Sequence, residues 1–370
     1  MSDMDLFEKL SNDDGPHGGA DDPGGYDRAA ARNDSQDERI VLAHGAGGRM
    51  SRQLIADLVL KHFPHPVLHR LEDSAVIDLP AGRWAFTTDS HVIRPLFFPG
   101  GDIGKLAVTG TVNDLLCAGA RPGYLSLSLI IEEGLPIADL ERILASAGRE
   151  AAEIGVEVVC GDTKVVERGK GDGLFINTAG IGAVLPGVDV APEKIRIGDA
   201  ILVSGTIGDH GIAILSQREG FDLKSLLKSD CAALQGLVLA ILEPPGSVHC
   251  LRDPTRGGLG TVLAEIAADR QAGIELDQIH LPLRNEVRGA CEMLGLDPMY
   301  VANEGKMVLF VEWERHEEIL SILRRDPLGR DAALIGRVVE SHPGLAVMRT
   351  SAGGSRIIDL PEGELIPRIC

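Results

Sequence analysis

The stretch Phe97-Phe98-Pro99-Gly100-Gly101-Asp102-Ile103-Gly104 is a glycine-rich turn that leads into a helix predicted over residues 103–118. On that helix the residues Ala107, Gly110 and Asp114 fall on one face, with Asn113 beside them. A helix that packs on a core normally turns bulky apolar side chains inward. We therefore expect this face, with its small residues and its carboxylate, to lie against a ligand.

Outward from this helix, apolar periodicity predicts a series of strands and helices. Structure begins with an apolar run at residues 39–43 and a helical pattern over 50–59, and alternation is clearest in residues 124–131. The other predicted strands are 84–88, 156–160, 177–184, 199–204, 248–251, 307–311, 332–339 and 345–349. The other predicted helices are 137–154, 259–270 and 314–325, with one more within 220–246. Pro186-Gly187 and the loop to Pro192 predict a domain boundary.

Carboxylates stand next to several of the predicted strands. They are Asp73 before residues 76–77, Asp89 after 84–88, Asp162 after 156–160 and Asp253 after 248–251. Each acid alone is more often a cap or turn residue. Together, with small hydroxyl-rich neighbours and few basic ones, they favour Mg²⁺ bound with a polyphosphate, because hard oxygen ligands suit that ion. Asp162 and Lys164 could equally form a surface ion pair worth about 1 kcal/mol or less.

A second glycine-rich turn, His44-Gly45-Ala46-Gly47-Gly48-Arg49, precedes the helical pattern of residues 50–59. Free backbone N–H groups at the start of a helix can bind phosphate oxygens. The turn lacks the Lys and Ser/Thr of a P-loop and fails the dinucleotide fingerprint GxGxxG. Taken alone it is a weak signal, since glycines in a turn often mean only tight geometry.

Composition bounds the possible functions. The chain has 370 residues and a net charge of −19, which argues against nucleic acid or an anionic membrane as a partner. No apolar run approaches the roughly 18 residues that a membrane span needs, and no signal peptide opens the chain. The six cysteines form no CxxC pair and no metal-binding spacing. They predict reduced thiols in a cytoplasmic protein.

The two ends of the chain differ from the rest. Residues 1–38 hold eleven Asp or Glu against three Lys or Arg, which predicts a disordered acidic leader with a solvating role. Residues 351–370 contain Pro361 and Pro367 and end at Cys370. We expect a flexible, extended arm with a hinge at 351–355 and a thiol at its tip. The alternative is a frayed terminus that happens to end in cysteine. A prenylation signal is excluded, since it needs three residues after the cysteine.

Several motifs, taken together, resemble the HypE family of nickel–iron hydrogenase maturation proteins. The resemblance covers roughly residues 38–370 and excludes the leader. The motifs are His44-Gly-Ala-Gly-Gly, Thr87-Thr-Asp-Ser, Phe98-Pro-Gly-Gly-Asp-Ile-Gly, Gly161-Asp-Thr-Lys-Val-Val, Asp253-Pro-Thr-Arg-Gly-Gly, Ala302-Asn-Glu-Gly and the terminal Pro-Arg-Ile-Cys.

The resemblance implies an α/β (α+β) fold of the aminoimidazole ribonucleotide synthetase and selenophosphate synthetase superfamily. It implies an N-terminal domain over 39–186 that binds ATP and Mg²⁺ and contributes strands to a barrel at a homodimer interface. A C-terminal α/β domain would cover 187–350. The implied activity is ATP-dependent dehydration of a carbamoyl group on the terminal cysteine to a thiocyanate. The implied partners are the carbamoyltransferase HypF and the HypC–HypD iron scaffold, which receives the cyanide.

The resemblance also assigns roles to residues. Cys370 would carry the carbamoyl group, Glu304 would act as the base, and Lys164 would handle the charge of the substrate. The residues implied for ATP are Gly45, Gly47, Gly48, Asn113, Asp162 and Asp253. The residues implied for Mg²⁺ are Asp73, Asp89, Asp114, Asp162 and Asp253.

Two other functions were weighed. A sister enzyme could phosphorylate a free small molecule, but a selenophosphate synthetase would be expected to carry a reactive cysteine or selenocysteine in residues 44–49, which hold none. An aminoimidazole ribonucleotide synthetase gives no reason for a terminal cysteine. The chain could also be a thiol-tipped binding scaffold with structural acids. ATP hydrolysis that depends on a carbamoylated tail would exclude the scaffold.

Overall fold

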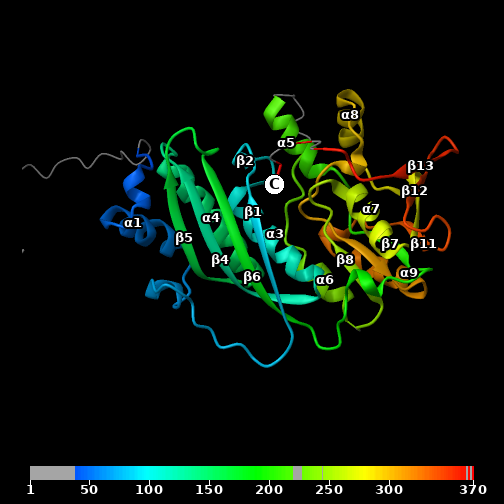
Figure 1. The fold of residues 1–370 in the computed structure, drawn as a ribbon, viewed down its shortest axis with the longest axis horizontal. Coiled ribbons are helices and arrows are strands. Elements are labelled where there is room, and N and C mark those ends of the chain that lie inside the picture. The colour runs from blue at the N-terminus through cyan, green and yellow to red at the C-terminus, as the bar shows by residue number, and fades with distance from the viewer. Residues whose placement is uncertain (1–37, 220–226, 244, 364–365, 367–368) are drawn as a thin grey trace, which may run out of the picture. The chain divides into compact units, whose positions relative to one another are not determined.

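The computed structural model describes residues 38–219, 227–243, 245–363, 366 and 369–370. The acidic leader therefore lies outside the described residues, apart from Glu38. Within residues 35–370, which form one compact unit, the strands make a four-stranded sheet, a seven-stranded sheet and a short two-stranded one (Figure 1). No helix among the described residues is long and apolar enough to cross a membrane.

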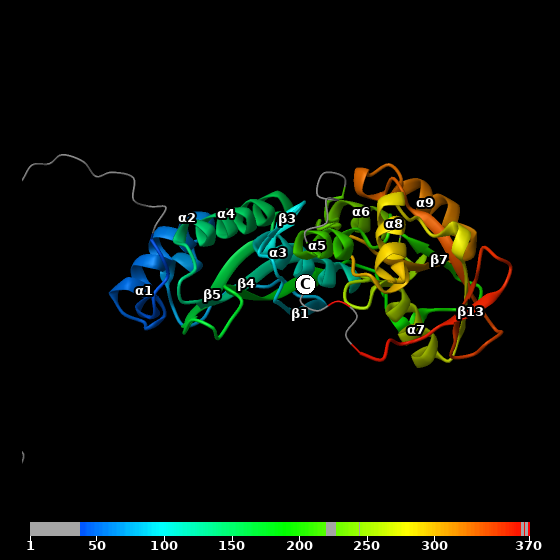
Figure 2. The same ribbon diagram turned by 90° about the horizontal axis from the view of Figure 1, so that it is seen from above.

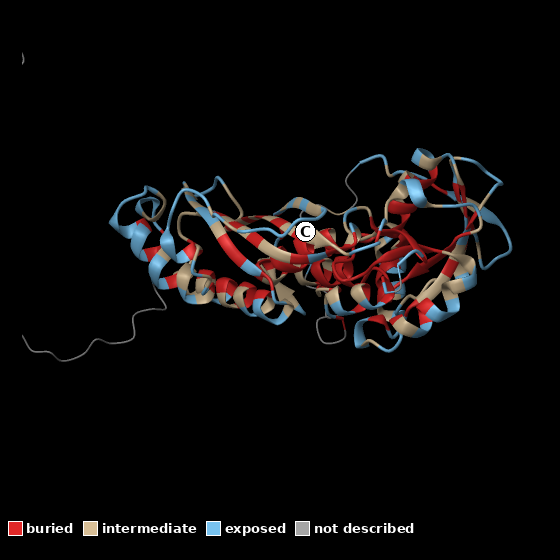
Figure 3. Cartoon of the chain, turned by 90° about the horizontal axis from the view of Figure 1, so that it is seen from below, coloured by how far each residue is buried: buried red, intermediate tan, exposed pale blue. Residues whose placement is uncertain are grey.

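The four-stranded sheet has the order β1-β6-β4-β5. Its strands are β1 (Trp84–His91), β4 (Ala120–Glu132), β5 (Glu157–Val166) and β6 (Leu174–Val184), and only the β4–β5 pair is parallel. Helices α3 (Ile103–Cys117) and α4 (Ile137–Ile154) cover one face of it (Figure 2). Burial alternates along β6, as expected when only one face of a sheet is packed (Figure 3).

The seven-stranded sheet has the order β13-β12-β9-β11-β7-β10-β8. Its strands are β7 (Ala200–Val203), β8 (Val248–Arg252), β9 (Gly273–Asp277), β10 (Val308–Val311), β11 (Ala333–Val339), β12 (Ala346–Arg349) and β13 (Ser355–Ile358), and only β9 and β12 pair in parallel. The helices after residue 200 are α5 (Asp209–Glu219), α6 (Gln235–Ile241), α7 (Gly258–Arg270), α8 (Asn285–Leu294) and α9 (His316–Leu323).

Both faces of the centre of this sheet are buried. In β7, Ile201 and Val203 belong to the cluster that α7 covers, whereas Ala200 and Leu202 belong to the cluster that includes α6 and α9. The second cluster also contains Leu125 of the first sheet, so the apolar core runs from one sheet to the other. Along the chain, the strands of the four-stranded sheet end at Val184 and those of the seven-stranded sheet begin at Ala200. The domain limits 39–186 and 187–350 stay a prediction.

The predicted helices 103–118 and 137–154 are confirmed as α3 and α4, and the predicted strands from residue 84 onward are found within six residues of their limits. The apolar run at 39–43, where we expect structure to begin, belongs to no strand or α-helix of the described residues. There Leu42–Gly45 is a 3-10 helix, and Arg39 makes one isolated bridge to Pro136. The helical pattern of 50–59 is split into α1 (Arg49–Leu54), a π-helical turn (Ile55–Val59) and α2 (Leu60–His62).

We expect the face of α3 with small residues to lie against a ligand, but most of that face packs against strands β1 and β6. A Cβ atom added to Gly110 would lie 3.1 Å from Oδ2 of Asp89 and 3.0 Å from His91, so the glycine lets α3 approach β1 closely. Ala107 is fully buried, and its carbonyl accepts a hydrogen bond from Thr178 on β6. Only Asp114, farther along the same face, borders a cavity.

The C-terminal arm is less free than predicted. Residues Ser355–Ile358 pair with β12 as the edge strand β13, so 351–355 is the turn of a β-hairpin and the start of β13. Arg356 forms an ion pair with Asp297, which fixes this strand to the loop before Pro298. The proposed hinge at 351–355 is therefore wrong, because strand pairing holds both of its ends.

Two further short elements complete the described fold. Strands β2 (Phe97–Phe98) and β3 (Gly101–Asp102) form a small hairpin before α3, and the Asp102 carboxylate accepts hydrogen bonds from the backbone N–H groups of Gly104 and Lys105. This side-chain cap satisfies two of the free donors at the start of α3. The glycine-rich turn at residues 97–104 thus fixes where α3 begins.

Candidate active site

Four carboxylates converge where the two sheets meet. Asp89 comes from β1, Asp114 from α3, Asp253 from the turn after β8 and Glu304 from the segment before β10. Asp114 and Asp253 line a cavity of about 590 Å³, together with Arg256 and Thr87. The charges of neighbouring acids in this group help to raise the pKa values of Asp114, Asp253 and Glu304. We call these four residues the acid cluster.

Asp114 titrates far from its ordinary range. Burial, followed by the charge of Asp253, raises its pKa to about 7, and Asp89 adds to the effect. The hydroxyl of Thr87 donates a hydrogen bond of 2.9 Å to its Oδ2 and partly offsets the shift. A carboxyl group that titrates near neutrality in a cavity is typical of a functional site.

Asp253 is held by a tight turn. Gly258 has a φ of +63°, and a Cβ atom there would lie 2.7 Å from the carbonyl oxygens of Met299 and Val301. Only glycine fits this position, which explains the Gly-Gly pair after Arg256. Burial, followed by the charge of Asp89 among the groups that oppose ionisation, raises the pKa of Asp253.

Glu304 is buried, and its Oε1 has no hydrogen-bond partner among the described residues. Its backbone is fixed: its N–H donates to Oδ1 of Asp230 (3.1 Å), and its carbonyl accepts from Asn113 (3.4 Å). Burial and then the charges of Asp230 and Asp253 raise the pKa of Glu304 well above its usual range. An unpaired buried carboxyl is costly, so it indicates a group that waits for a ligand.

The terminal cysteine is docked against this cluster. The C-terminus lies near β1 and α5 in both ribbon views (Figure 1, Figure 2). The thiol of Cys370 is within hydrogen-bonding reach of Glu304, and burial followed by the Glu304 charge raises its pKa well above the ordinary value. The backbone N–H of Val92 donates to a terminal oxygen of Cys370 (3.2 Å), and Ile369 is buried in the core. The tip of the chain is therefore part of the site in this structure.

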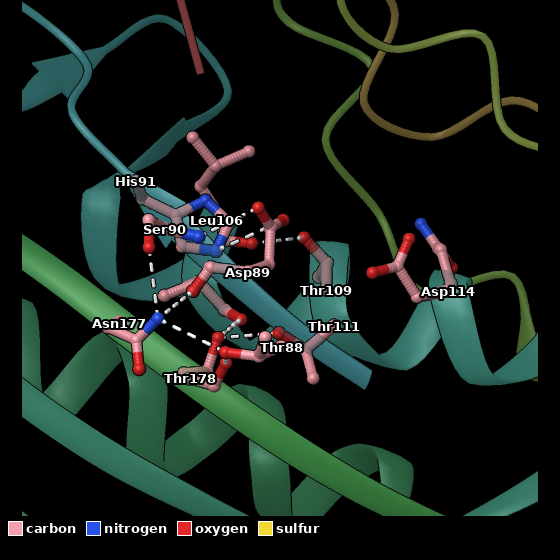
Figure 4. Close-up of polar contacts among 12 residues, drawn as sticks. Thr88, Asp89, Ser90, His91, Leu106, Thr109, Thr111, Asp114, Asn177 and Thr178 are labelled. Atoms are coloured by element: carbon pink, nitrogen blue, oxygen red, sulfur yellow. Dashed lines mark hydrogen bonds and ion pairs between the residues drawn. The ribbon is translucent and has the colours of Figure 1, made fainter. Parts of the chain in front are cut away.

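Asp89 lies at the open side of the cluster, with its side chain 30% exposed. Its Oδ1 accepts a hydrogen bond from the backbone N–H of Ser90 (2.8 Å), and its Oδ2 lies 3.4 Å from Nε2 of His91 (Figure 4). Asn177 on the neighbouring strand donates to the carbonyl oxygen of Asp89 (2.8 Å). These contacts orient the carboxylate and leave most of its acceptor capacity unused.

The acid cluster fits a divalent cation that arrives with a phosphate ligand. No group of three or more His, Cys, Asp or Glu side chains among the described residues is close enough to hold a metal by itself. The raised pKa values of Asp114 and Asp253 and the partnerless Oε1 of Glu304 show that the cations among the described residues do not suffice to keep these buried carboxyl groups ionised. Mg²⁺ suits such a place, because it usually binds one or two carboxylates and takes its other ligands from water and phosphate.

Asp162 and Lys164 lie elsewhere. They are within β5, not beyond its end, and they form an ion pair of 3.0 Å with both side chains about two-thirds exposed. Strand β5 is the edge of the four-stranded sheet opposite to β1, which carries Asp89. Within one chain this pair has the geometry of the surface ion pair that we considered as the alternative.

The residues 44–49 also lie at the β5 edge. A Cβ atom on Gly45 would be 2.4 Å from the backbone nitrogen of Val165, so this glycine is required for close packing on β5. Gly47 and Gly48 are exposed with open space around them. Asp73 is exposed before β1, and no hydrogen bond or ion pair joins it to the acid cluster in the described part of the chain. The structure therefore does not bring these predicted residues to the acids.

Asn113 has a structural role in this chain. Its amide donates to the carbonyl of Ala232 (3.0 Å), and its oxygen accepts from the N–H of Leu234 (3.0 Å). Both ends of the side chain are thereby used to hold the segment before α6 and the backbone of Glu304. Asn113 therefore holds the backbone of Glu304, and the N–H groups of its side chain donate to main-chain carbonyls rather than into the cavity.

Sequence reasoning missed three residues of the site. Arg256 is the cation whose charge acts on both Cys370 and His91, His91 contacts Asp89, and His210 contacts the tail. A signal existed for two of them, because Arg256 stands inside the motif at 253–258 and His91 directly follows Asp89-Ser90. No local pattern marked His210.

The raised pKa of Asp114 predicts a pH-dependent stability. The folded chain holds this proton up to about pH 7, whereas the unfolded chain releases it near 3.8, so the ligand-free protein loses stability as pH rises between these values. Asp114→Asn should therefore unfold with a free energy higher by about 2 kcal/mol at pH 8 and be nearly neutral at pH 4. Urea unfolding at both pH values measures this, with the exposed Asp269→Asn as control. An equal effect at the two pH values would contradict the assignment.

Comparisons with known proteins show which class of proteins shares this fold. Models of the AIR synthase related proteins match the chain twice, the N-terminal domain over residues 71–184 and the C-terminal domain over 196–347. The mixed α/β fold with two domains is thus that of the AIR synthase related class.

Relatives within this class are close. The carbamoyl dehydratase HypE of Azotobacter vinelandii is 51% identical over 340 residues, which is 92% of this chain and 100% of that protein. The crystal structure of the hydrogenase maturation protein HypE in complex with ATP has a TM-score of 0.86 at 49% identity and covers 89% of this chain and 99% of that one. A HypE–HypF complex has a TM-score of 0.73 at 44% identity, over 85% and 100%. The chain belongs to the HypE family.

Proposed function

We propose that this chain uses ATP to dehydrate a carbamoyl group carried on Cys370, which yields a thiocyanate for the cyanide ligands of a nickel–iron hydrogenase. The observation that carries the proposal is the docking of the Cys370 thiol against Glu304, at the edge of the acid cluster. A docked thiol brings any group bound to its sulfur into the same place. The names of its relatives, carbamoyl dehydratase and HypE in complex with ATP, support the same reaction.

The reaction needs an activated oxygen. The carbonyl oxygen of the S-carbamoyl group attacks the γ-phosphorus of ATP, and ADP leaves. The carbamoyl carbon then carries a phosphate in place of a poor leaving group. Loss of both protons from nitrogen and departure of inorganic phosphate leave the S–C≡N group. The sum is one thiocarbamate and one ATP converted to one thiocyanate, ADP and phosphate.

Glu304 is the proposed base in this sequence. Its raised pKa makes the ionised carboxylate a stronger proton acceptor than an ordinary glutamate. Glu304 lies beside the Cys370 sulfur. The nitrogen of a carbamoyl group on that sulfur would therefore also lie close to the Glu304 carboxylate. Positive charge bound at the neighbouring aspartates would favour the ionised form of Glu304.

Asp89, Asp114 and Asp253 are the proposed ligands of Mg²⁺ and ATP within this chain. Mg²⁺ would neutralise charge on the transferring phosphate. The three carboxylates are the ones whose mutual repulsion a cation would relieve, and Asp89 is the most exposed of them. Asp114 and Asp253 line one cavity, which supports a shared ligand, and the charge of Asp89 acts on both of them.

A homodimer would complete the site. One face of the four-stranded sheet is not covered by helices, and Phe86 on β1 and Ile130 on β4 are exposed there. We propose that two such sheets close into the predicted barrel. Placing the β5 edge of one copy beside the β1 edge of its partner would bring Asp162, Lys164, Asp73 and the glycines 45, 47 and 48 toward the partner's acid cluster. This arrangement would account for residues that lie apart within one chain.

The wider assignments follow from the same proposal. HypF would supply the carbamoyl group, as the HypE–HypF complex of a relative suggests, and the HypC–HypD scaffold would accept the cyanide. The domain limits 39–186 and 187–350 and a cytoplasmic location belong to this proposal as well. The acidic leader has no part in the chemistry.

Intact mass spectrometry tests the proposed function. The chain is incubated with the carbamoyltransferase, carbamoyl phosphate and ATP, and the terminal peptide is analysed over time. We expect a carbamoyl adduct on the Cys370 peptide, followed by loss of water that requires ATP. An adduct that never loses water, or an adduct on another cysteine, would refute the proposal.

Asp89→Asn tests the ligand set. The variant should keep its fold but bind Mg–ATP at least about tenfold more weakly, because a carboxylate that faces the metal loses its charge. Calorimetry with Mg–ATP measures the affinity, and Asp269→Asn, on the exposed side of α7, is the matched control. An affinity equal to that of the control would remove Asp89 from the site.

A further inference from the structure

His210, the second residue of α5, contacts the end of the tail. Its Nε2 lies 2.6 Å from the carbonyl oxygen of Ile369, the residue before the acceptor cysteine. Its Nδ1 lies 2.7 Å from the hydroxyl oxygen of Ser229. The ring is fully buried and meets the edge of Phe98 at 5.6 Å between centroids. None of the roles assigned above uses this side chain.

The partners of the ring fix its tautomer. A carbonyl oxygen can only accept, so Nε2 must carry the proton and donate it to Ile369. Nδ1 then accepts from the hydroxyl of Ser229, whose oxygen in turn accepts from the N–H of Cys231 (3.0 Å). Burial lowers the pKa of His210, which keeps the ring neutral and preserves this chain of hydrogen bonds. The imidazole is therefore preset to hold a carbonyl group at that point.

The side chain of Ile369 is held at the same place. It is 4% exposed and belongs to the core cluster that joins the two sheets. A Cβ atom on Gly211, next to His210, would lie 3.2 Å from Cδ1 of Ile369, so this glycine leaves room for the tail. With the N–H of Val92 on the terminal oxygen, the last two residues are held both by the residue that follows β1 and by α5.

The other end of the arm has its own attachment. The hydroxyl of Tyr300 donates to the carbonyl of Asp359 (2.7 Å) and accepts from its N–H (3.1 Å). Together with the pairing of β13, this fixes the arm up to Asp359. Between this attachment and the tip, Ile366 packs against the core, and the described hydrogen bonds nearest to Cys370 are those at the tip itself.

We propose that His210 is a positioning residue for the dehydration: its Nε2–H holds the Ile369 carbonyl and thereby places the sulfur of Cys370 against Glu304. The inference that His210 serves the dehydration rests on the proposed function. Its first test, the alkylation rate of Cys370, measures only the position of the tail and does not depend on that function. The contact acts on the main chain of the tail, so it would hold the carbamoylated and the free thiol alike. Losing it would release the tip without changing the acid cluster.

Two substitutions separate this role from simple packing. In His210→Gln the side-chain amide nitrogen reaches the place of Nε2 and can still donate to Ile369. In His210→Asn the shorter side chain can reach Ser229 but not the tail. Loss of one buried hydrogen bond should raise the alkylation rate of Cys370 about five- to tenfold in the asparagine variant and leave it near the native rate in the glutamine variant. Alkylation is followed by peptide mass spectrometry, with Cys160 and the buried Cys250 as internal references.

The second readout is single-turnover dehydration of the carbamoylated chain. His210→Asn should lower its rate constant by a similar factor with unchanged affinity for Mg–ATP, and His210→Gln should restore it. If the tail is released but no dehydration occurs even in the native chain, the proposed function fails and the positioning role stands. Equal alkylation rates in the folded asparagine and glutamine variants would overturn the positioning role.

A third variant covers the case in which both substitutions unfold the chain. Ser229→Ala keeps the imidazole but removes the partner that fixes its tautomer. The Ile369 carbonyl still requires the proton on Nε2, but the ring loses the hydrogen bond that orients it, so its hold on the tail weakens and the alkylation rate of Cys370 should rise. An unchanged rate in this variant would overturn the proposal.

Discussion

Cys370→Ala should accept no carbamoyl group and form no thiocyanate, a complete loss of function. The thiol is the nucleophile to which the carbamoyl group would be joined, and a methyl group cannot replace it. The fold should survive, because Ile369, His210 and Val92 keep every contact that the structure gives the tip apart from the thiol. Mass spectrometry of the terminal peptide after reaction with the carbamoyltransferase measures the outcome.

Cys160→Ala is the matched control for this experiment. Cys160 is a partly buried thiol on β5, and we expect the variant to be carbamoylated at the native rate. Thermal unfolding of both variants should match the native chain closely. A carbamoyl adduct on the Cys370→Ala chain would mean that another cysteine is the acceptor and that the docked tail has a different purpose.

The elements that surround the site could be predicted well from local pattern. Helix α3 begins where the Asp102 cap closes it, and β4 shows the alternation that its one packed face demands. The run at 39–43 shows a limit of local pattern, because the apolar residues 40–43 are too few to distinguish a strand from the 3-10 helix that begins at Leu42 beside β5. Length alone could not distinguish the two.

The acids that converge come from a strand, a helix and two connecting segments that meet at one place. Asp89, Asp114, Asp253 and Glu304 come from segments more than 200 residues apart in total, and tertiary packing brings them together. Asp162 was predicted beside them because it stands in a similar motif, yet β5 and β1 are opposite edges of the sheet. Sequence order could not reveal this, since register and strand order are set by non-local pairing.

The arm shows a different limit. Prolines and glycines predicted no helix after residue 350, and the described residues there form none, but they gave no sign that Ser355–Ile358 would join the seven-stranded sheet. The four residues supply an edge strand, and Ile369 supplies a buried side chain. A short apolar segment at a terminus therefore carried more structure than its composition indicated.

Glu304→Gln should lower the rate of thiocyanate formation by about 10²- to 10⁴-fold, the usual range for removing a general base. Glutamine keeps the size of the side chain and can still hydrogen-bond the Cys370 thiol, but it cannot take a proton from nitrogen. Carbamoylation of Cys370 by the partner enzyme should be unaffected, since the proposal gives Glu304 a role only in the later loss of protons from nitrogen. The carbamoylated variant should therefore accumulate.

The same substitution has a second consequence that a purely structural role would not produce. Removing the Glu304 charge removes one cause of the raised pKa of Cys370, so the thiol of the variant should titrate closer to its ordinary range. Because burial raises the pKa of Glu304, dehydration by the native chain should increase as pH rises through its ionisation and then level off. Single-turnover mass spectrometry between pH 5 and pH 9 measures both points, with Asp269→Asn as the exposed control. A native pH profile and a native rate in Glu304→Gln would show that another group accepts the protons.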